Sequence, residues 1–349
     1  MSSPRLLAFA WNLAFVACCA AQTAPQPPVA PPTPDDTKPA TEQGTPAPEG
    51  EKVKAPKHPI EETIEPLAIK EGETAPTAAG LVERALAHMG GERLAATKSL
   101  EFERQSMHWG NRRLVYTERY RTQCKLTWPP VARVTELAFD TVKRKARPAM
   151  MFVQNGSDAF MQADLEVFSY PANEDAAKTR TATELGVPLL LSWLARSNAT
   201  MTLDGRAIVR SFTPKTYLGI QRDDKKDEGF ADYEPTTSSY VRVTVAMPAD
   251  LTAYYGDELM LYFDEADGRL VRWRMVPLSR SVDRYGTEEV VFEVESYVPA
   301  VGADGQSTNV KFPGRVHAML AGSAERVETL ELKNVVIDSE QKDELFRRP

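Results

Sequence analysis

The sequence predicts an α+β domain in which antiparallel strands dominate and a few helices pack against them. Three observations indicate this class. Apolar and polar residues alternate through most of the later segments, as they do in half-buried antiparallel strands. Tight-turn signals, Asn155-Gly156 and Asp267-Gly268, join two pairs of these segments. One stretch, residues 183–196, is instead apolar nearly throughout, which is typical of a buried helix.

The clearest hairpin covers residues 259–275, LMLYFDEADGRLVRWRM. Alternation places three residues of each strand on one face: Leu259, Leu261 and Phe263, and Val271, Trp273 and Met275. Phe263 and Trp273 are candidates for the side of the sheet that faces a helix. Three carboxylates, Asp264, Glu265 and Asp267, crowd the turn, but they lack the spacing of an EF-hand calcium loop. We therefore interpret this segment as an ordinary hairpin turn.

Composition excludes one class of partner and limits the disulfides. A formal net charge of −7 argues against a nucleic-acid binder, which needs basic patches to neutralise phosphates. Of the three cysteines, Cys18 and Cys19 lie in the N-terminal apolar run, so only Cys124 remains in the body of the chain. Cys124 occupies an alternating apolar position, which predicts a small buried side chain rather than a reactive thiol.

The N-terminus is typical of a bacterial export signal. Residues 1–21 hold Arg5, a short apolar run over residues 6–16 and a small-residue cleavage region. The run is shorter than the roughly 20 apolar residues of a transmembrane helix. The sequence allows two alternative cleavage sites for this signal. Phe15-Val16-Ala17-Cys18 is similar to a lipobox, which would make Cys18 the lipidated first residue; cleavage after Ala21 would instead release a soluble protein.

Two further parts follow the signal. Residues 22–77 are low in complexity and crowded with proline, so we expect a disordered tether that cannot bury enough apolar surface to fold. Residues 78–349 then form the folded domain. Residues 78–89 have the apolar spacing of a helix that ends at Gly90-Gly91, and a short second helical turn follows.

Strands make up most of what remains. Their predicted ranges are 100–109, 114–126, 131–139, a hairpin over 149–164, and then 207–212, 216–221, 239–246, 290–298, 310–312, 316–320 and 327–337. Residues 173–183 are polar and predicted to be a loop, and residues 339–346 form a last helical turn.

The apolar stretch 183–196, TELGVPLLLSWLAR, is predicted to be a helix with Pro188 in its first turn. Its apolar residues cover more than one helical face: Leu189, Leu190, Leu191, Trp193 and Leu194. Such a helix is either buried between two surfaces as core or faces a ligand cavity as a lid. The sequence leaves both interpretations open.

Catalytic and cofactor motifs are missing from the sequence. It contains no nucleophile elbow, P-loop or dinucleotide fingerprint, and no cysteine pair with metal spacing after the signal region. The four histidines, His58, His88, His108 and His317, are scattered. We therefore predict no enzyme activity, no cofactor and no metal site, with a hydrolase assembled from distant residues as the remaining enzymatic alternative.

Several segments together resemble the LolA/LolB-like superfamily of periplasmic proteins that sort outer-membrane lipoproteins. They are the helix and Gly-Gly of GLVERALAHMGGERLAATKSLEF, the unit MMFVQNGSDAFMQ, the pair KTYLGIQ and SYVRVTV, the hairpin LYFDEADGRLVRWRM, and the ending VETLELKNVVIDSEQKDELFRRP. The resemblance implies a strongly curved antiparallel sheet, an unclosed half-barrel, with helices plugging its concave face. No residue here matches that family's gating arginine, and the loops after Phe168 and Gln221 are longer than in the compact carriers.

The resemblance also implies a function. Residues 183–196 would be a plug helix over an apolar cavity lined by Leu189, Leu190, Leu191, Trp193, Leu194, Phe263 and Trp273. The protein would be a non-enzymatic, exported binding protein that holds a lipoprotein acyl chain or another apolar ligand there. It would be periplasmic and anchored to the outer membrane through Cys18 if the lipobox is used. The alternative is a periplasmic protein-interaction or sensor module whose core is filled by side chains.

Overall fold

We analysed a computed structural model of the chain. It describes residues 59–69, 74–110, 113–127, 129–140, 145–163, 166–168, 170–214, 233–276, 289–323 and 325–348. All of them belong to the second of two units into which the chain divides, Lys54–Pro349. The predicted signal with Cys18, the tether up to residue 58 and the predicted strand 216–221 lie outside the described residues. No helix in the described ranges is long and apolar enough to cross a membrane.

One sheet of 14 strands dominates the described residues, in the order β1-β8-β9-β10-β11-β12-β13-β14-β2-β3-β4-β5-β6-β7. All neighbouring pairs in this order are antiparallel. The strands are β1 (Glu61–Glu65), β2 (Ser99–Gly110), β3 (Arg113–Lys125), β4 (Val131–Asp140), β5 (Lys145–Asn155), β6 (Asp158–Ala163), β7 (Glu166–Phe168), β8 (Thr200–Pro214), β9 (Tyr233–Ala246), β10 (Glu258–Asp264), β11 (Leu270–Met275), β12 (Val290–Gly302), β13 (Ser307–Leu320) and β14 (Arg326–Ile337).

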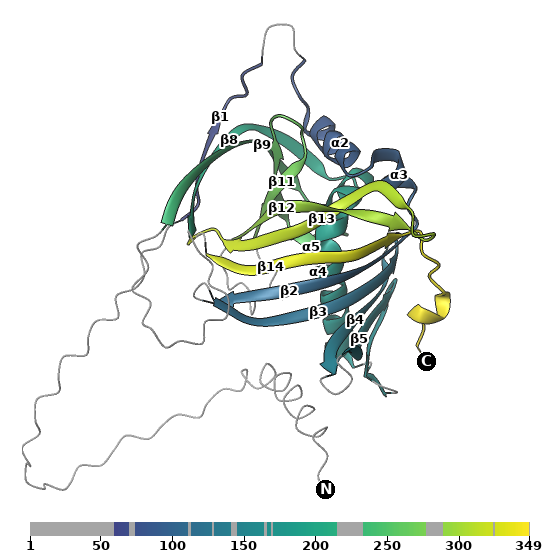
Figure 1. Ribbon diagram of the computed structural model, residues 1–349. Helices are drawn as coiled ribbons and strands as arrows, with labels where there is room; N and C mark the ends of the chain where they lie inside the picture. The colour runs from purple at the N-terminus through teal and green to yellow at the C-terminus, as the bar shows by residue number, and fades with distance from the viewer. Residues whose placement is uncertain are drawn as a thin grey trace, which may run out of the picture. The chain divides into compact units, whose positions relative to one another are not determined.

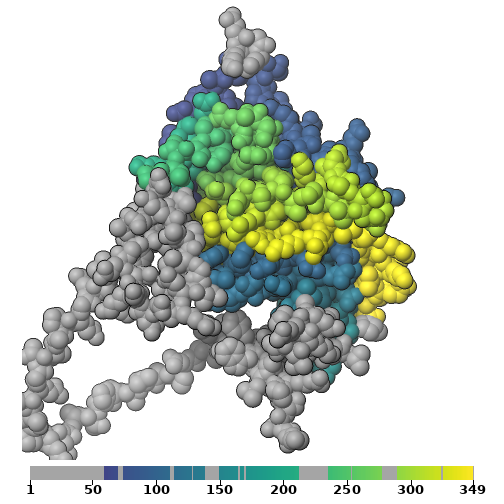
Figure 2. All heavy atoms as spheres, viewed as in Figure 1, coloured from purple at the N-terminus to yellow at the C-terminus, as the bar shows by residue number. Residues whose placement is uncertain are grey.

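The sheet is open, because β1 and β7 stand at its two ends and do not pair with each other. It curves around helix α4 (Pro171–Arg196), which crosses behind the strands in Figure 1. The space-filling view shows the yellow atoms of β14 beside the blue atoms of β2, so strands from early and late in the described chain lie side by side in the middle of the sheet (Figure 2). The predicted α+β class, an unclosed curved antiparallel sheet with helices on one face, is confirmed.

In the described part of the chain, four helices and one short 3-10 turn accompany the sheet: α2 (Ala78–His88), α3 (Gly91–Ala96), α4, α5 (Thr252–Tyr255) and η2 (Asp343–Phe346). α2 begins after Thr77, whose side chain accepts a hydrogen bond from the Gly80 N–H at 3.0 Å. It ends at His88 with Met89 as its C-cap, just before Gly90-Gly91, where the sequence predicts its end. Gly90 has φ 118°, and an added Cβ would lie 2.9 Å from the Val310 Cα, so only glycine fits between this turn and β13.

The main core lies between the sheet and these helices. It contains the inward side chains of the hairpin that joins β10 and β11, where Leu259 pairs with Met275 and Leu261 with Trp273, as the alternation predicts. A bulge after Tyr262 sets Leu270 rather than Val271 opposite Phe263. The prediction for Val271 was therefore wrong, and this side chain packs in a separate small cluster with Tyr262.

Two sequence expectations need correction. Residues 173–183 are not a loop, because α4 starts at Pro171 and runs through them. Their polar composition suggests a loop, but charged side chains of this part of the helix contact other elements: Glu174 pairs with Arg348, and Arg180 covers the Tyr120 ring. The segment expected to be disordered up to residue 77 contains β1, which pairs with β8 from Glu61 opposite Arg210 to Glu65 opposite Arg206. Ordered structure therefore begins before Ala78.

Candidate functional site

α4 spans the concave face of the sheet and is the element that the predicted site depends on. Its first half contacts β4, β5 and β6, and its second half lies among α2, α5 and the main core. Pro188 sits inside the helix rather than in its first turn, so its position was predicted wrongly. Proline has no N–H to donate to the carbonyl four residues earlier, and packing on all sides must offset that missing bond.

The structure brings all seven predicted site residues into one core. Leu189, Leu190, Leu191, Trp193, Leu194, Phe263 and Trp273 are each at most 6% exposed and belong to the same apolar cluster. Trp273 stacks on Phe292 with ring centres 5.0 Å apart. Trp193 meets Tyr254 edge to face at 4.7 Å. The side chains that were expected to line a cavity therefore contact one another and their neighbours closely.

A small hollow lies at the C-terminal end of α4. Its volume is about 150 Å³, and its lining comes from Thr127, Trp193, Arg196, Ser197, Asp250 and Leu251. Of the seven predicted residues, Trp193 is the one that reaches it. The hollow therefore borders the main core at Trp193 and Leu251.

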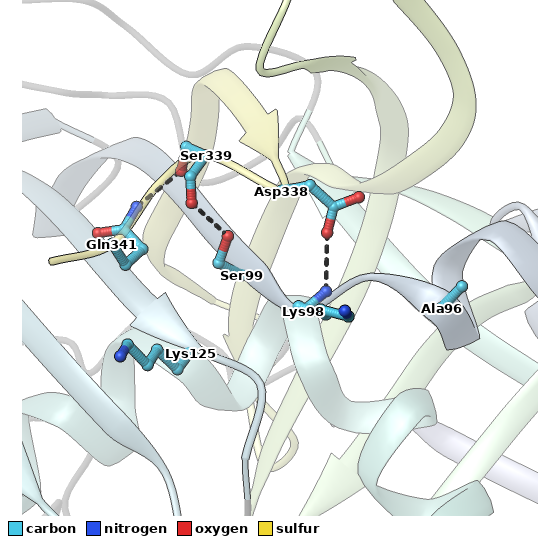
Figure 3. A pocket seen from close by; sticks show the side chains of 7 residues that line it. All are labelled: Ala96, Lys98, Ser99, Lys125, Asp338, Ser339 and Gln341. Atoms are coloured by element: carbon cyan, nitrogen blue, oxygen red, sulfur yellow. Dashed lines mark hydrogen bonds between the residues drawn. The ribbon is translucent and has the colours of Figure 1, made fainter. Parts of the chain in front are cut away.

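A second, more polar hollow of about 440 Å³ lies where the C-terminal segment crosses the start of β2 and the end of β3. Figure 3 shows its lining: Ala96, Lys98, Ser99, Lys125, Asp338, Ser339 and Gln341. Its polar groups are largely bound to each other. The Lys98 N–H donates to Asp338 Oδ1 at 2.8 Å, and the Ser99 hydroxyl donates to the Ser339 carbonyl at 2.7 Å. These contacts fasten the C-terminal segment to the sheet.

The first half of α4 carries a buried ion pair that the sequence reading missed. Arg104 on β2 and Glu184 on α4 lie 2.6 Å apart, and their side chains are 1% and 0% exposed. Arg180, one turn earlier, lies 3.7 Å from Glu184 and covers the Tyr120 ring at 4.4 Å. Burial raises the pKa of Tyr120 well above its usual range, although Arg180 opposes this. The concave face is thus apolar under one half of α4 and charged under the other.

A pattern in β2 signals this polar region. The inward positions of that strand run from apolar to polar: Leu100, Phe102, Arg104, Ser106 and His108 are all buried. An arginine at a position that alternation assigns to the core must find a charged partner, because an unpaired buried charge is very costly. Such a position is therefore a sequence signal for a buried pair.

One group of side chains has the composition of a hydrolase triad. His317 Nε2 lies 2.6 Å from Glu295 Oε2, and His317 Nδ1 lies 3.0 Å from the Thr329 hydroxyl. Burial lowers the pKa of His317, with Arg326 adding to the effect and Glu295 opposing it. Thr329 is 0% exposed and accepts a hydrogen bond from the Trp109 indole at 3.0 Å. This hydroxyl is therefore closed to solvent, and the group links four strands, β2, β12, β13 and β14.

Cys124 and the carboxylates of the acidic turn, which are candidate reactive or metal-binding groups in the sequence, make structural contacts instead. Cys124 is buried as predicted, and burial raises the pKa of its thiol to about 12. In the acidic turn, Asp264 Oδ1 accepts the Ala266 N–H at 2.8 Å and Asp267 Oδ1 accepts the Arg269 N–H at 3.0 Å. Within the described ranges, no three His, Cys, Asp or Glu side chains are grouped so that they could hold a metal ion.

Comparison with known proteins finds similarity at the level of structure. No family profile and no curated protein matches the sequence. A LolA-superfamily protein from Nitrosomonas europaea is 11% identical, with a TM-score of 0.42, over 78% of this chain and 99% of its own. A DUF1329-family protein from Desulfovibrio piger is 10% identical, with a TM-score of 0.42, over 77% and 97%.

A third similar structure is a domain described as a candidate outer membrane lipoprotein-sorting protein from Vibrio parahaemolyticus. It is 8% identical, with a TM-score of 0.37, over 77% of this chain and 96% of its own. The chain is similar, at low identity, to proteins of the LolA superfamily and to others described as lipoprotein-sorting or DUF1329 proteins.

Proposed function

We propose that this protein is a non-enzymatic, exported binding protein that holds an acyl chain or another apolar ligand between α4 and the concave face of the sheet. One observation supports this above all. The concave face of an open sheet is covered there by the second half of α4, whose residues from Leu185 to Leu194 are nearly all apolar and buried. A helix of this kind can exchange its apolar contacts for those of an apolar ligand.

Ligand entry requires movement, because side chains fill the space in the described arrangement. Hydrogen bonds to α5 and to α3 also hold the second half of α4. The Tyr255 hydroxyl donates to the Gly186 carbonyl at 2.8 Å, and Arg196 Nη2 donates to the Ala95 carbonyl at 3.1 Å. An acyl chain that entered beside Trp193 and shifted the helix would replace one apolar surface by another. Burial of the chain would contribute about 25 cal/mol per Å² before binding costs.

The hollow beside Trp193 gives this proposal a direct test. Full-length protein would be titrated with a brominated 16-carbon fatty acid, whose bromine quenches nearby indoles. We expect Trp193→Phe to reduce the quenching, with Trp273 quenched still, and Trp109→Phe to leave it unchanged, because Trp109 lies on the opposite face and bonds to Thr329. Quenching that is equal in both variants, or absent from the parent protein, would remove the carrier proposal.

A second candidate is a protein-interaction or sensor module that binds no lipid. The close packing of all seven predicted residues favours it, because a filled core needs no ligand. Native mass spectrometry of protein extracted from the cell envelope separates the two candidates. Co-purified lipid supports the carrier, whereas a ligand-free mass with no fatty-acid quenching supports the module.

We further propose that the protein is exported to the periplasm and anchored to the outer membrane through Cys18. This proposal rests on the sequence of residues 1–21 and on the lipobox-like Phe15-Val16-Ala17-Cys18. Palmitate labelling of the full chain in its cells should be lost in Cys18→Ser and kept in Cys19→Ser. Labelling that survives Cys18→Ser would reject Cys18 as the lipidated residue.

A further inference from the structure

β1 is an acidic strand at the edge of the sheet. Glu61–Glu65 pairs antiparallel with the part of β8 that runs from Arg206 to Arg210. Just before the strand, the Ile60 N–H donates to the Ala321 carbonyl at 2.8 Å. Most of the strand is exposed, and Glu62 is its one half-buried member. The strand is therefore held by its backbone pairing with β8, by the Ile60 hydrogen bond and by the side-chain contacts of Glu62.

Three donors converge on the Glu62 carboxylate. Oε1 accepts a hydrogen bond from Arg242 Nη1 at 3.1 Å, and Oε2 accepts from the Tyr262 hydroxyl at 3.0 Å and from Arg274 Nη1 at 3.4 Å. The Glu62 side chain is only 10% exposed. Charge-assisted bonds of this kind are the stronger ones in proteins, and the Glu62 carboxylate adds a negative charge between two guanidinium groups.

The three donors are themselves held in place. Arg242 Nε donates to Asp204 Oδ2 at 2.9 Å, and Arg274 forms an ion pair with Glu289. Burial lowers the pKa of Arg242, but Glu62 and Asp204 together raise it above its usual value. Burial, with Glu62 adding to it, raises the pKa of Tyr262 to about 12, so its hydroxyl remains a donor. The carboxylate site is thus built by β9, β10 and β11 and not by β1 alone.

Apolar contacts flank the carboxylate. Ile60 packs against a small cluster that contains Ala207, Val209 and Tyr262, on the face of β10 and β11 opposite the main core. The backbone of β8 leaves room for the strand at Gly205. A Cβ there would lie 2.3 Å from the Glu65 carbonyl oxygen and 3.4 Å from the Ile64 side chain. The site therefore accepts an extended segment with Ile, Glu and Ile at alternate positions.

We propose that the edge of β8, together with Arg242, Tyr262 and Arg274, is a binding site for an acidic extended segment of a partner protein, and that β1 occupies this site within the chain. A strand added to a sheet edge gains affinity from main-chain hydrogen bonds and specificity from pockets for alternate side chains. Here the pocket selects a carboxylate. β1 pairs over five residues only, so a partner segment of the same pattern competes for the same edge.

The test uses the full-length chain and a labelled peptide, PIEETIEPL, that copies residues 59–67. Glu62→Gln weakens the internal strand, and Glu61→Gln is the matched control, since its carboxylate is 57% exposed and 3.7 Å from Arg210. We expect amides of residues 206–210 to exchange hydrogen at least about tenfold faster in Glu62→Gln. The peptide should also bind that variant at least about tenfold more tightly than it binds the parent protein. Glu61→Gln should match the parent protein in both measurements.

A second peptide and a second variant complete the design. A peptide with glutamine in place of Glu62 should bind the Glu62→Gln chain at least about tenfold more weakly than PIEETIEPL does. Thr63→Pro loosens β1 without touching the donors, because proline disrupts strand pairing. Thr63→Pro replaces Glu62→Gln in the exchange and PIEETIEPL-binding measurements if Glu62→Gln does not fold. Unchanged exchange in both variants, equal binding of the two peptides, or a dimer that exchanges β1 and excludes the peptide would each overturn the proposal.

Discussion

The two halves of α4 lie on the same concave face but are held to it by different interactions. Residues from Leu185 to Leu194 pack into the main apolar core. The turns before them, around Ala177 to Glu184, meet a smaller cluster of Tyr120, Val134 and Phe152 and the buried Arg104–Glu184 pair. Apolar packing can be rearranged or replaced by any apolar group of suitable size. A buried carboxylate needs a cation within reach, so a buried ion pair tolerates little displacement.

This contrast separates the tasks of the two halves. The first half fixes where the helix crosses the sheet, since Glu184 can pair with Arg104 in one register only. The second half covers the part of the concave face to which we assign the ligand. A helix whose first half is fixed by an ion pair, and whose second half makes exchangeable apolar contacts, can shift at its C-terminal end and still return to one position.

Removal of the Glu184 carboxylate should have the largest effect on stability. Glu184→Ala leaves Arg104 charged and unpaired at 1% side-chain exposure, and this should lower the free energy of unfolding by about 3–5 kcal/mol. The measurement is urea unfolding followed by circular dichroism. The double variant Arg104→Met with Glu184→Leu should recover most of the loss. If the double variant is no more stable than Glu184→Ala, packing and not charge holds this half of the helix.

Truncation in the second half should cost somewhat less. Leu190→Ala removes a side chain that is 1% exposed in the main core, with an expected loss of about 2–4 kcal/mol from transfer and cavity terms. Leu190→Met keeps the volume and should cost less than about 1.5 kcal/mol. Unlike Glu184→Ala, Leu190→Ala should also leave a space that an added fatty acid can fill. A rise in the melting temperature of Leu190→Ala on addition of palmitate would show this. The absence of any rise would count against the view that a ligand can replace the apolar contacts of the second half of α4.

The sequence predicts the apolar half of this contrast better than the charged half. Alternation was enough to place Phe263 and Trp273 on the inward face, because period 2 in a strand depends on local geometry alone. It failed at Val271, since the bulge after Tyr262 adds one residue to the strand and no local signal marks it. The ligand-lining role of the inward residues stays a prediction.

The charged half depends on partners that are far apart in the sequence. Residues 173–183 have the polar composition of a loop. Their side chains find partners, such as the Tyr120 ring for Arg180, only once the sheet has formed. β1 was missed for a related reason. Its five residues EETIE continue an acidic, proline-rich composition, and their docking site is supplied by Arg242, Tyr262 and Arg274.

A smaller effect is expected at Thr181, in the charged half. Its hydroxyl is fully buried and has no hydrogen-bond partner among the described residues, and the same holds for Ser106 on β2. A buried hydroxyl without a partner costs about 1–3 kcal/mol, so Thr181→Val should raise the free energy of unfolding by about 1 kcal/mol. Thermal and urea unfolding would measure the change. A loss of stability instead would show that the hydroxyl binds an ordered water or a ligand group.

The smallest predicted effect concerns pH and Glu136, which lies beside the same charged cluster on β4. Burial raises the pKa of Glu136 above its usual 4.5 and Glu118 adds to the rise, while Arg180 lowers it. The folded chain therefore keeps this proton to a higher pH than the unfolded chain does. As pH increases from 4.5 through the folded pKa, the free energy of unfolding should decrease. Glu136→Gln removes this titration, so the variant should be more stable than the parent protein above that window and no more stable below it. Urea unfolding from pH 4 to pH 8 would measure the difference. Parallel curves for the two proteins would show that burial does not raise the pKa of Glu136.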